Sequence, residues 1–340
     1  MRRGIPRHDP APDPWPAPVE KPSWRSAAAP DPGEIPPAWP EPGYEHPPVP
    51  GGSWPPSPPR VPPAGAPRRR RRRRLVVRLV VAFLVIQLVV AAFIGSLGWW
   101  APRRTAFMLE SGQPVVYQYV SLDHVSRYLI AAVIAHEDEQ LGTRSGAFAM
   151  SQLSSRARAY LSGQPDPSGS TIPQQLAKNI FLWSHQDPAR KSIEAALASE
   201  MSWSLPPQRL MELYVNYAQF GPGLFGLCTA SWYYFGEPPW SMTQYQADQL
   251  MGVLPDPDRV RRAAGGGLDL GPQADPQAVD LINGAANVHV PRELEGMGGW
   301  QAAVATIGIH DTAATHAAGV SSADACSTMP QSVAQRLPQS

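Results

Sequence analysis

The chain contains very little lysine and cysteine, and both shortages are informative. Three of its 29 basic residues are lysines, and its two cysteines are Cys228 and Cys326. Two cysteines in 340 residues exclude a disulfide framework, although they leave a single bridge open outside the cytoplasm. We expect Cys228, in an apolar helical stretch, to be a buried core thiol, and Cys326 to lie in a loose tail. The net charge of +1 gives no general bias towards acidic partners. No nucleic-acid partner is expected.

The chain also lacks internal repeats, a phosphate-binding P-loop motif and any long alternation of polar and apolar residues. Without that alternation, the folded part is predicted to be mainly α-helical. The helical period and helix-start signals predict helices over residues 121–139, 146–161, from 171 onwards, from 187 to 205, from 207 to 220, and over 226–235, 243–254, 276–286 and 299–307, with one short strand in 115–120.

The first part of the chain is rich in proline and ends in a run of arginines. Residues 1–67 hold 23 of the 41 prolines and too few apolar residues to form a core, which predicts a disordered tail. Its proline motifs suit either an extended spacer, which we favour, or docking into an aromatic groove of a partner.

A membrane-spanning helix is predicted directly after this tail. Residues 79–100 carry no charge and are long enough to cross ~30 Å of hydrocarbon, with Trp99 and Trp100 at the far interface. Seven arginines precede the span and Arg103 and Arg104 follow it, so the N-terminus is expected in the cytoplasm. The arginine run also resembles a nucleic-acid patch, but its junction with the span favours a role in topology and in binding anionic lipids. The predicted organisation is a cytoplasmic tail (1–74), a transmembrane helix (75–100), an extracytoplasmic catalytic domain (101–262), a linker with short packing helices (263–308) and a disordered tail (309–340).

Two charged segments of this domain are candidates for chemistry. Glu137, Asp138 and Glu139 end a predicted helix, where the helix dipole disfavours negative charge and so suits a general base. Residues 169–179 contain a capping box, Thr171-x-x-Gln174, whose free backbone N–H groups form a natural seat for phosphate. Taken alone, the first segment is better explained as a solvated helix end.

Two of the three lysines, Lys178 and Lys191, lie thirteen residues apart in one charged region. Their compact ammonium groups indicate a site for an anionic substrate. Arg190, Lys191 and Glu194 share one face of a helix predicted to start at Asp187. Taken alone, that face is better explained as a surface ladder of ion pairs.

Together, these segments resemble the conserved blocks of the peptidoglycan glycosyltransferases of glycosyltransferase family 51, in their monofunctional form. Residues 137–146 resemble the first block, Glu-Asp-x-x-Phe-x-x-His-x-Gly, with Leu141 and Arg144 in place of its Phe and His. Ser-x-x-Lys and Lys-Thr-Gly motifs are absent, so a penicillin-binding transpeptidase domain is not expected. The other blocks match at 169–179, 190–194, 212–221 (Glu212, Tyr214, Asn216 and Gly221) and 254–257, and the resemblance covers about residues 110–260.

The resemblance implies a mainly α-helical, lysozyme-like domain with a smaller membrane-proximal lobe. It implies polymerisation of lipid II into β-1,4-linked glycan with inversion and release of undecaprenyl pyrophosphate. Glu137 would be the general base, and Lys178, Arg190 and Lys191 would stabilise the pyrophosphate with the helix start at Ser170 and Thr171. Glu194, the second essential glutamate, would orient these cations or hold a divalent metal. Gln174, Asn179, Asn216 and Arg144 are the further candidates for substrate contacts, and Asp138 is either structural or a second metal ligand.

The partners implied by the resemblance are lipid II, the growing glycan strand, membrane lipids and proteins of the divisome or elongation complex. A divalent cation (Mg or Mn) is the one candidate cofactor, and no organic cofactor is expected. Because Arg144 replaces the histidine of the block, the role of this position in the acceptor site stays open. The replacement predicts that this protein has lower activity, or a different pH profile, than its Arg144→His variant. The sequence leaves two other functions open: a catalytically impaired lipid II-binding scaffold, and a glycan hydrolase, which the cationic block disfavours.

Overall fold

The computed structural model describes residues 66–148, 162, 169–183, 188–311, 316 and 324–337. The predicted disordered tail up to residue 65, most of the predicted helix over 146–161 and the predicted helix cap at Asp187 lie outside these residues.

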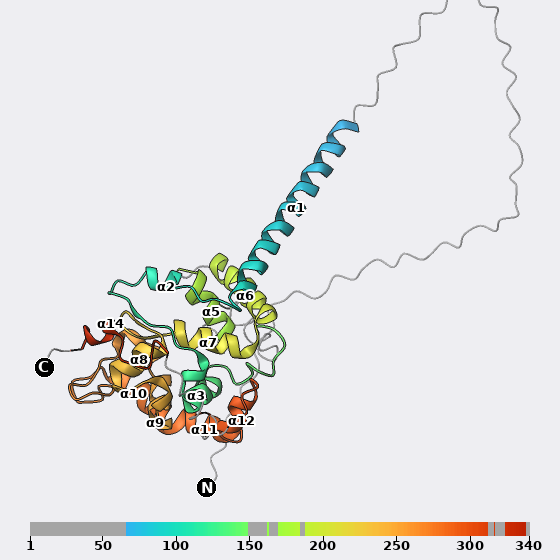
Figure 1. Ribbon diagram of the computed structural model, residues 1–340. Coiled ribbons are helices and arrows are strands. Elements are labelled where there is room, and N and C mark those ends of the chain that lie inside the picture. Colours follow the sequence, from blue (N-terminus) through green and yellow to red (C-terminus); the bar gives the residue numbers. More distant parts are fainter. Residues whose placement is uncertain are drawn as a thin grey trace, which may run out of the picture. The chain divides into compact units, whose positions relative to one another are not determined.

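The described part of the chain is mainly helical, as predicted. Each predicted helix within it is present, although several differ in length (Figure 1). The helices are α1 (Ala66–Ser96), α2 (Ala106–Leu109), α3 (Arg127–Glu137), α5 (Ile172–Phe181), α6 (Pro188–Ser204), α7 (Pro207–Tyr217), α8 (Leu227–Tyr234), α9 (Gln244–Met251), α10 (Pro276–Gly284), α11 (Val290–Gly296), α12 (Trp300–Ala305) and α14 (Gln331–Ala334), with short turns η1 (Leu122–His124), η2 (Pro239–Ser241), η3 (Pro257–Arg259) and η4 (Ala285–His289).

Helix α1 contains the arginine run and the apolar segment. Its residues 71–96 form a helix long and apolar enough to cross a membrane; residues 71–89 are exposed, whereas Ile94 near its end is buried. The helix ends at Ser96, four residues before the end of the predicted span. Beyond it, Leu97 is fully buried in the domain core, and Arg209 Nε donates to the Leu97 carbonyl at 2.7 Å.

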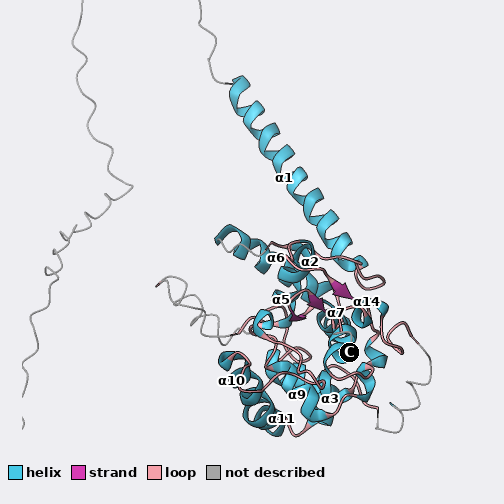
Figure 2. Cartoon of the chain, turned by 90° about the vertical axis from the view of Figure 1, so that its left-hand side faces the viewer, coloured by secondary structure: helices cyan, strands magenta, loops and turns pink. Residues whose placement is uncertain are grey.

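Three very short strands lie among the helices (Figure 2). They are β1 (Val116–Tyr117), β2 (Gln219–Gly221) and β3 (Leu224–Phe225), in the order β1-β3-β2. β3 runs parallel to β1 and antiparallel to β2. The turn between β2 and β3 requires Gly223, which has φ +68°, and a Cβ there would lie 2.6 Å from the Pro114 carbonyl oxygen.

The predicted helix over residues 121–139 is interrupted near its start. Residues 122–124 form the turn η1, Val125 is extended, and α3 begins at Arg127. Ser126 causes the break because its backbone N–H donates to Pro239 O and its hydroxyl donates to Met242 O at 2.9 Å. A periodic pattern within the segment carries no information about these partners, which are more than 110 residues away in the sequence.

The segment after the predicted domain end at residue 262 belongs to the same core. Arg262 and Leu268 form a β-bridge, so this part is folded onto the domain and is not a free linker. The predicted packing helices correspond to α10 and α12, and α11 lies between them. Helices α11 and α12 pack against α3, and α10 packs against α9 (Figure 1). Ile282, Val290 and Ala303 are fully buried there.

The expectations of a free core thiol and a loose tail were both wrong. Cys228 of α8 is buried, but it forms a disulfide with Cys326, 98 residues away in the sequence. Trp232 Nε1 donates to the Cys326 carbonyl at 2.9 Å, and Arg336 Nη2 donates to the Pro222 carbonyl at 2.5 Å. Residues 324–337 are therefore an ordered strap across α8, held by a covalent bond.

A Cys326→Ser variant should lose about 2–4 kcal/mol of unfolding free energy, because the disulfide closes a long loop and restricts the unfolded chain. Chemical denaturation of the purified protein would measure this loss. In reductant, the unfolding free energy of the wild-type protein should fall to that of the variant. The unfolding free energy of the variant should not change when reductant is added. Equal stability of oxidised wild type and variant would contradict a stabilising role for the strap.

Candidate active site

The active-site candidates converge where the end of α3 meets the start of α5. Glu137 is the last residue of α3 and Asp138 caps it. One oxygen of the buried Asp138 carboxylate, Oδ2, accepts a hydrogen bond from the Ile172 N–H at 3.1 Å. This bond joins the two helices, and it fixes Glu137 beside the segment that carries Lys178.

Glu137 is positioned by a short chain of hydrogen bonds. Gln175 Nε2 donates to Glu137 Oε2 at 2.7 Å, and also to the Ser170 carbonyl at 3.0 Å. The Tyr214 hydroxyl donates to Gln175 Oε1 at 3.1 Å. Burial raises the pKa of Tyr214 well above its usual value, and the nearby Glu137 charge raises it further. Tyr214 therefore stays a neutral donor that orients Gln175.

Gln175 and Tyr214 were not among the predicted site residues. Both lie inside the matched blocks, and that position was the only signal in the sequence. Helical spacing favoured Gln174, four residues before Lys178, whereas it is the neighbouring Gln175 that contacts Glu137.

A Tyr214→Phe variant should lower kcat by about fivefold with little change in KM. The substitution keeps the ring but releases Gln175, so Glu137 would be less well oriented, and losing one neutral hydrogen bond is worth about 1 kcal/mol. The exposed Tyr245 offers a matched control, since Tyr245→Phe removes a hydroxyl far from Glu137 in the sequence and on the surface. An unchanged kcat in Tyr214→Phe would rule out the positioning chain.

Arg144 forms ion-pair and hydrogen-bond contacts within the protein. Its guanidinium forms a bidentate ion pair with Asp138, with Nη1–Oδ1 at 2.5 Å and Nη2–Oδ2 at 2.9 Å. Its Nε also donates to the Gly146 carbonyl, and only 6% of the side chain is exposed. Arg144 therefore has a structural role, because it holds the carboxylate that joins α3 to α5, and its predicted contact with substrate stays a prediction.

The predicted cations gather around Glu194 on α6. Glu194 is 2% exposed, its carboxylate contacts Lys191, and Arg190 Nη2 lies 3.6 Å from Oε2. Such burial excludes a simple surface ladder of ion pairs. Burial lowers the pKa of Lys178, the charge of Glu194 raises it, and the charges of Arg190 and Lys191 lower it, so all four side chains share one electrostatic environment.

The charge of Glu137 also raises the pKa of Lys178, so Glu137 and the cations share one electrostatic environment. A carboxylate and a group of cations are thus brought together from α3, α5 and α6. Such an arrangement can accept a proton at one point and stabilise negative charge developing nearby.

Three predicted substrate contacts are used inside the protein. Gln174 Oε1 accepts from the Thr171 N–H and hydroxyl, and this completes the predicted capping box. The Thr171 hydroxyl also donates to Ala147 O. The Asn216 side chain accepts from the Val120 N–H through Oδ1 and donates to the Val120 carbonyl through Nδ2. The Thr171 and Ile172 N–H groups are likewise occupied by Gln174 and Asp138, so they are not the predicted phosphate seat.

Asn179 lies in a cavity of about 270 Å³, which we call the inner cavity and which Gln175, Lys178 and Tyr214 also line. Its Nδ2 donates to the Tyr217 carbonyl at 3.3 Å. Its Oδ1 is buried and accepts no hydrogen bond from the described residues. A buried acceptor without a partner lowers stability, and this oxygen has almost no surface through which a ligand in the cavity could reach it.

The proposed metal ligands do not suit a divalent cation. Asp138 is paired with Arg144, and Glu194 with Lys191 and Arg190, so cations of the protein occupy both carboxylates. Within the described residues there is no group of three or more His, Cys, Asp or Glu side chains arranged to hold a metal. The carboxylates at this site fit ion pairing with the protein better than metal binding.

Comparison with known proteins identifies the family. A family model described as Transglycosylase matches residues 106–267, which include all the site residues. The biosynthetic peptidoglycan transglycosylase of Aeromonas hydrophila is 36% identical over 180 residues, covering 52% of this chain and 75% of the relative. Those of Shewanella oneidensis (36% over 180 residues, 52% and 76%) and Marinomonas sp. (38% over 153 residues, 45% and 68%) are similarly related. The chain belongs to the family of peptidoglycan transglycosylases and is a glycosyltransferase that acts on peptidoglycan precursors.

Proposed function

We propose that the protein polymerises lipid II into β-1,4-linked glycan with inversion at the anomeric carbon and release of undecaprenyl pyrophosphate. The observation that carries this proposal is the placement of Glu137, oriented by Gln175, within the electrostatic environment of Lys178, Arg190 and Lys191. Glycan transfer from a pyrophosphate donor needs a base for the acceptor and cations for the leaving group.

In the proposed reaction, Glu137 removes the proton from the 4-hydroxyl of the acceptor sugar. A lone pair of the deprotonated oxygen forms a bond to C1 of the donor sugar. The bond from C1 to the pyrophosphate oxygen breaks at the same time, and its electron pair stays on that oxygen. Lys178, Arg190 and Lys191 stabilise the negative charge on the departing pyrophosphate. Glu194 holds Arg190 and Lys191 in place through its ion pairs.

The same proposal places the N-terminus in the cytoplasm and the domain outside it. Helix α1 starts with the arginine run, which favours the cytoplasmic side of a membrane. The Cys228–Cys326 disulfide supports the domain's placement outside the cytoplasm, because such bonds persist in oxidising compartments.

A direct test is to incubate the purified full-length protein, in detergent, with lipid II. We expect glycan polymer, released undecaprenyl pyrophosphate and β-linked product. New reducing ends from finished glycan without consumption of lipid II would indicate a hydrolase instead. Tight binding of lipid II without polymer would indicate a scaffold.

A further inference from the structure

A cavity of about 440 Å³ is lined by the connector that follows α1 and by the segment around β1. We call it the arginine pocket, and its lining residues are Arg103, Arg104, Val115, Tyr117, Gln118, Tyr119 and Ser332. The two arginines are exposed, and neither forms a hydrogen bond or an ion pair with any residue that the structure describes. Two guanidinium groups without partners at one cavity are suited to an anion.

The charged side chains of this lining are all positive. The Tyr117 hydroxyl stays neutral, because burial raises its pKa to about 12. The Tyr119 hydroxyl contacts the carboxylate of Glu212, but Arg209 Nη1 lies 2.8 Å from the same carboxylate and offsets its charge. The arginine pocket therefore has an excess of positive charge.

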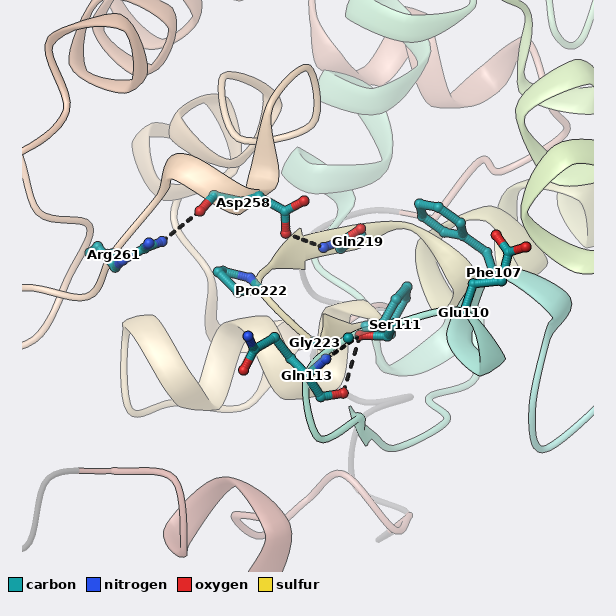
Figure 3. A pocket seen from close by; sticks show the side chains of 11 residues that line it. Phe107, Glu110, Ser111, Gln113, Gln219, Pro222, Gly223, Asp258 and Arg261 are labelled. Atoms are coloured by element: carbon teal, nitrogen blue, oxygen red, sulfur yellow. Dashed lines mark hydrogen bonds between the residues drawn. The ribbon is translucent and has the colours of Figure 1, made fainter. Parts of the chain in front are cut away.

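Two other cavities of the domain contain charges of both signs. Figure 3 shows the cavity of about 380 Å³ beside α2 and the turn η3, whose lining includes Glu110 and Asp258 together with Arg261. The inner cavity likewise combines Lys178 with Asp256 and Asp258. Of these three cavities, the arginine pocket is the one whose lining carries charge of a single sign.

Arg209 connects the arginine pocket to the end of the apolar helix. Its Nε and Nη2 donate to the carbonyls of Leu97 and Trp100, at 2.7 and 2.8 Å. Its Nη1 donates at 2.8 Å to the hydroxyl of Tyr119, which lines the pocket. Trp99, in the segment that Arg209 holds, is 87% exposed, and tryptophan is enriched at the interface between membrane and water. The headgroup of a lipid beside the end of α1 is therefore within reach of the pocket.

We propose that the arginine pocket binds the phosphate headgroup of an anionic membrane lipid. Guanidinium groups match phosphate oxygens through pairs of N–H donors, and the Ser332 hydroxyl adds a polar group to the lining. The volume of the pocket is within the range of about 300–1,000 Å³ that is usual for ligand sites. The inference depends on the proposed placement of α1 in a membrane and not on the proposed reaction at Glu137.

The test measures the binding of short-chain lipids to the purified full-length protein in a non-ionic detergent. Hydrogen–deuterium exchange of residues 115–120 gives a local readout, because most of this segment lines the pocket. Dihexanoyl phosphatidylglycerol should slow this exchange, whereas dihexanoyl phosphatidylcholine and inorganic phosphate at the same concentration should not. An R103Q/R104Q variant should need about 25 times more phosphatidylglycerol for the same effect, about fivefold for each arginine.

The charge-matched control is R71Q/R72Q, which removes two exposed arginines of the run in α1 and should respond to phosphatidylglycerol as the wild type does. No slowing by phosphatidylglycerol, or the same slowing in R103Q/R104Q as in the wild type, would overturn the inference. An equal effect of phosphatidylcholine or of inorganic phosphate would also overturn it, because the pocket would then not select an anionic lipid. These readouts do not involve polymerisation of lipid II, so each such result would leave the proposed reaction intact.

Discussion

Replacing Glu137 with glutamine should reduce lipid II polymerisation at least about a hundredfold, because general base catalysis typically contributes that much or more. The amide is nearly the same size as the carboxylate, so packing at the end of α3 should be preserved. It cannot accept the proton of the sugar hydroxyl. Rates of polymer formation, measured at saturating lipid II, would show the loss as a fall in kcat.

Glu139 provides a close control for this variant, because it lies two residues away and its side chain is exposed. A Glu139→Gln variant should polymerise lipid II at close to the wild-type rate. Thermal unfolding of both variants should match the wild type. Retention of more than a tenth of the activity by Glu137→Gln would exclude Glu137 as the base and direct attention to another carboxylate.

The local features of the fold were predictable from the sequence. The capping boxes at Thr171 and Thr243 are formed, and α7 begins at the predicted proline, because these signals depend on residues within one turn of each other. The break before α3 and the strap held by Cys326 were not predictable. Both depend on partners about a hundred residues away, and local periodicity contains no information about such contacts.

The site shows the same limit at the level of single side chains. Spacing along α5 predicted a role for Lys178 towards an anionic substrate, which stays a prediction, and it could not distinguish the contacts of Gln174 and Gln175. One completes the helix cap, and the other contacts Glu137. Asn216 was likewise predicted to contact substrate and instead holds the backbone of Val120. A motif indicates that a residue is needed, and the structure is required to show what it contacts.

Removing the guanidinium of Arg144 should destabilise the fold by about 3–5 kcal/mol. An Arg144→Ala variant would leave the Asp138 carboxylate buried without its partner, and such uncompensated charges are strongly destabilising. Asp138 also accepts the Ile172 N–H, so its displacement would loosen the joint between α3 and α5. Denaturant unfolding would measure the loss, and Arg292→Ala, at an exposed position on α11, should change stability by less than about 0.5 kcal/mol.

An Arg144→His variant, which restores the residue of the family block, separates a structural role from a role in binding. Imidazole has an ordinary pKa of about 6.5, and pairing with Asp138 would raise its pKa in the folded state. The stabilisation from that pair should therefore be complete below about pH 6.5 and decline as the pH rises through the raised value. The wild-type arginine stays charged throughout, so its stability should lack this dependence. If Arg144→Ala unfolded like the wild type and only KM for lipid II rose, Arg144 would contact substrate, and the pairing with Asp138 would not be its main role.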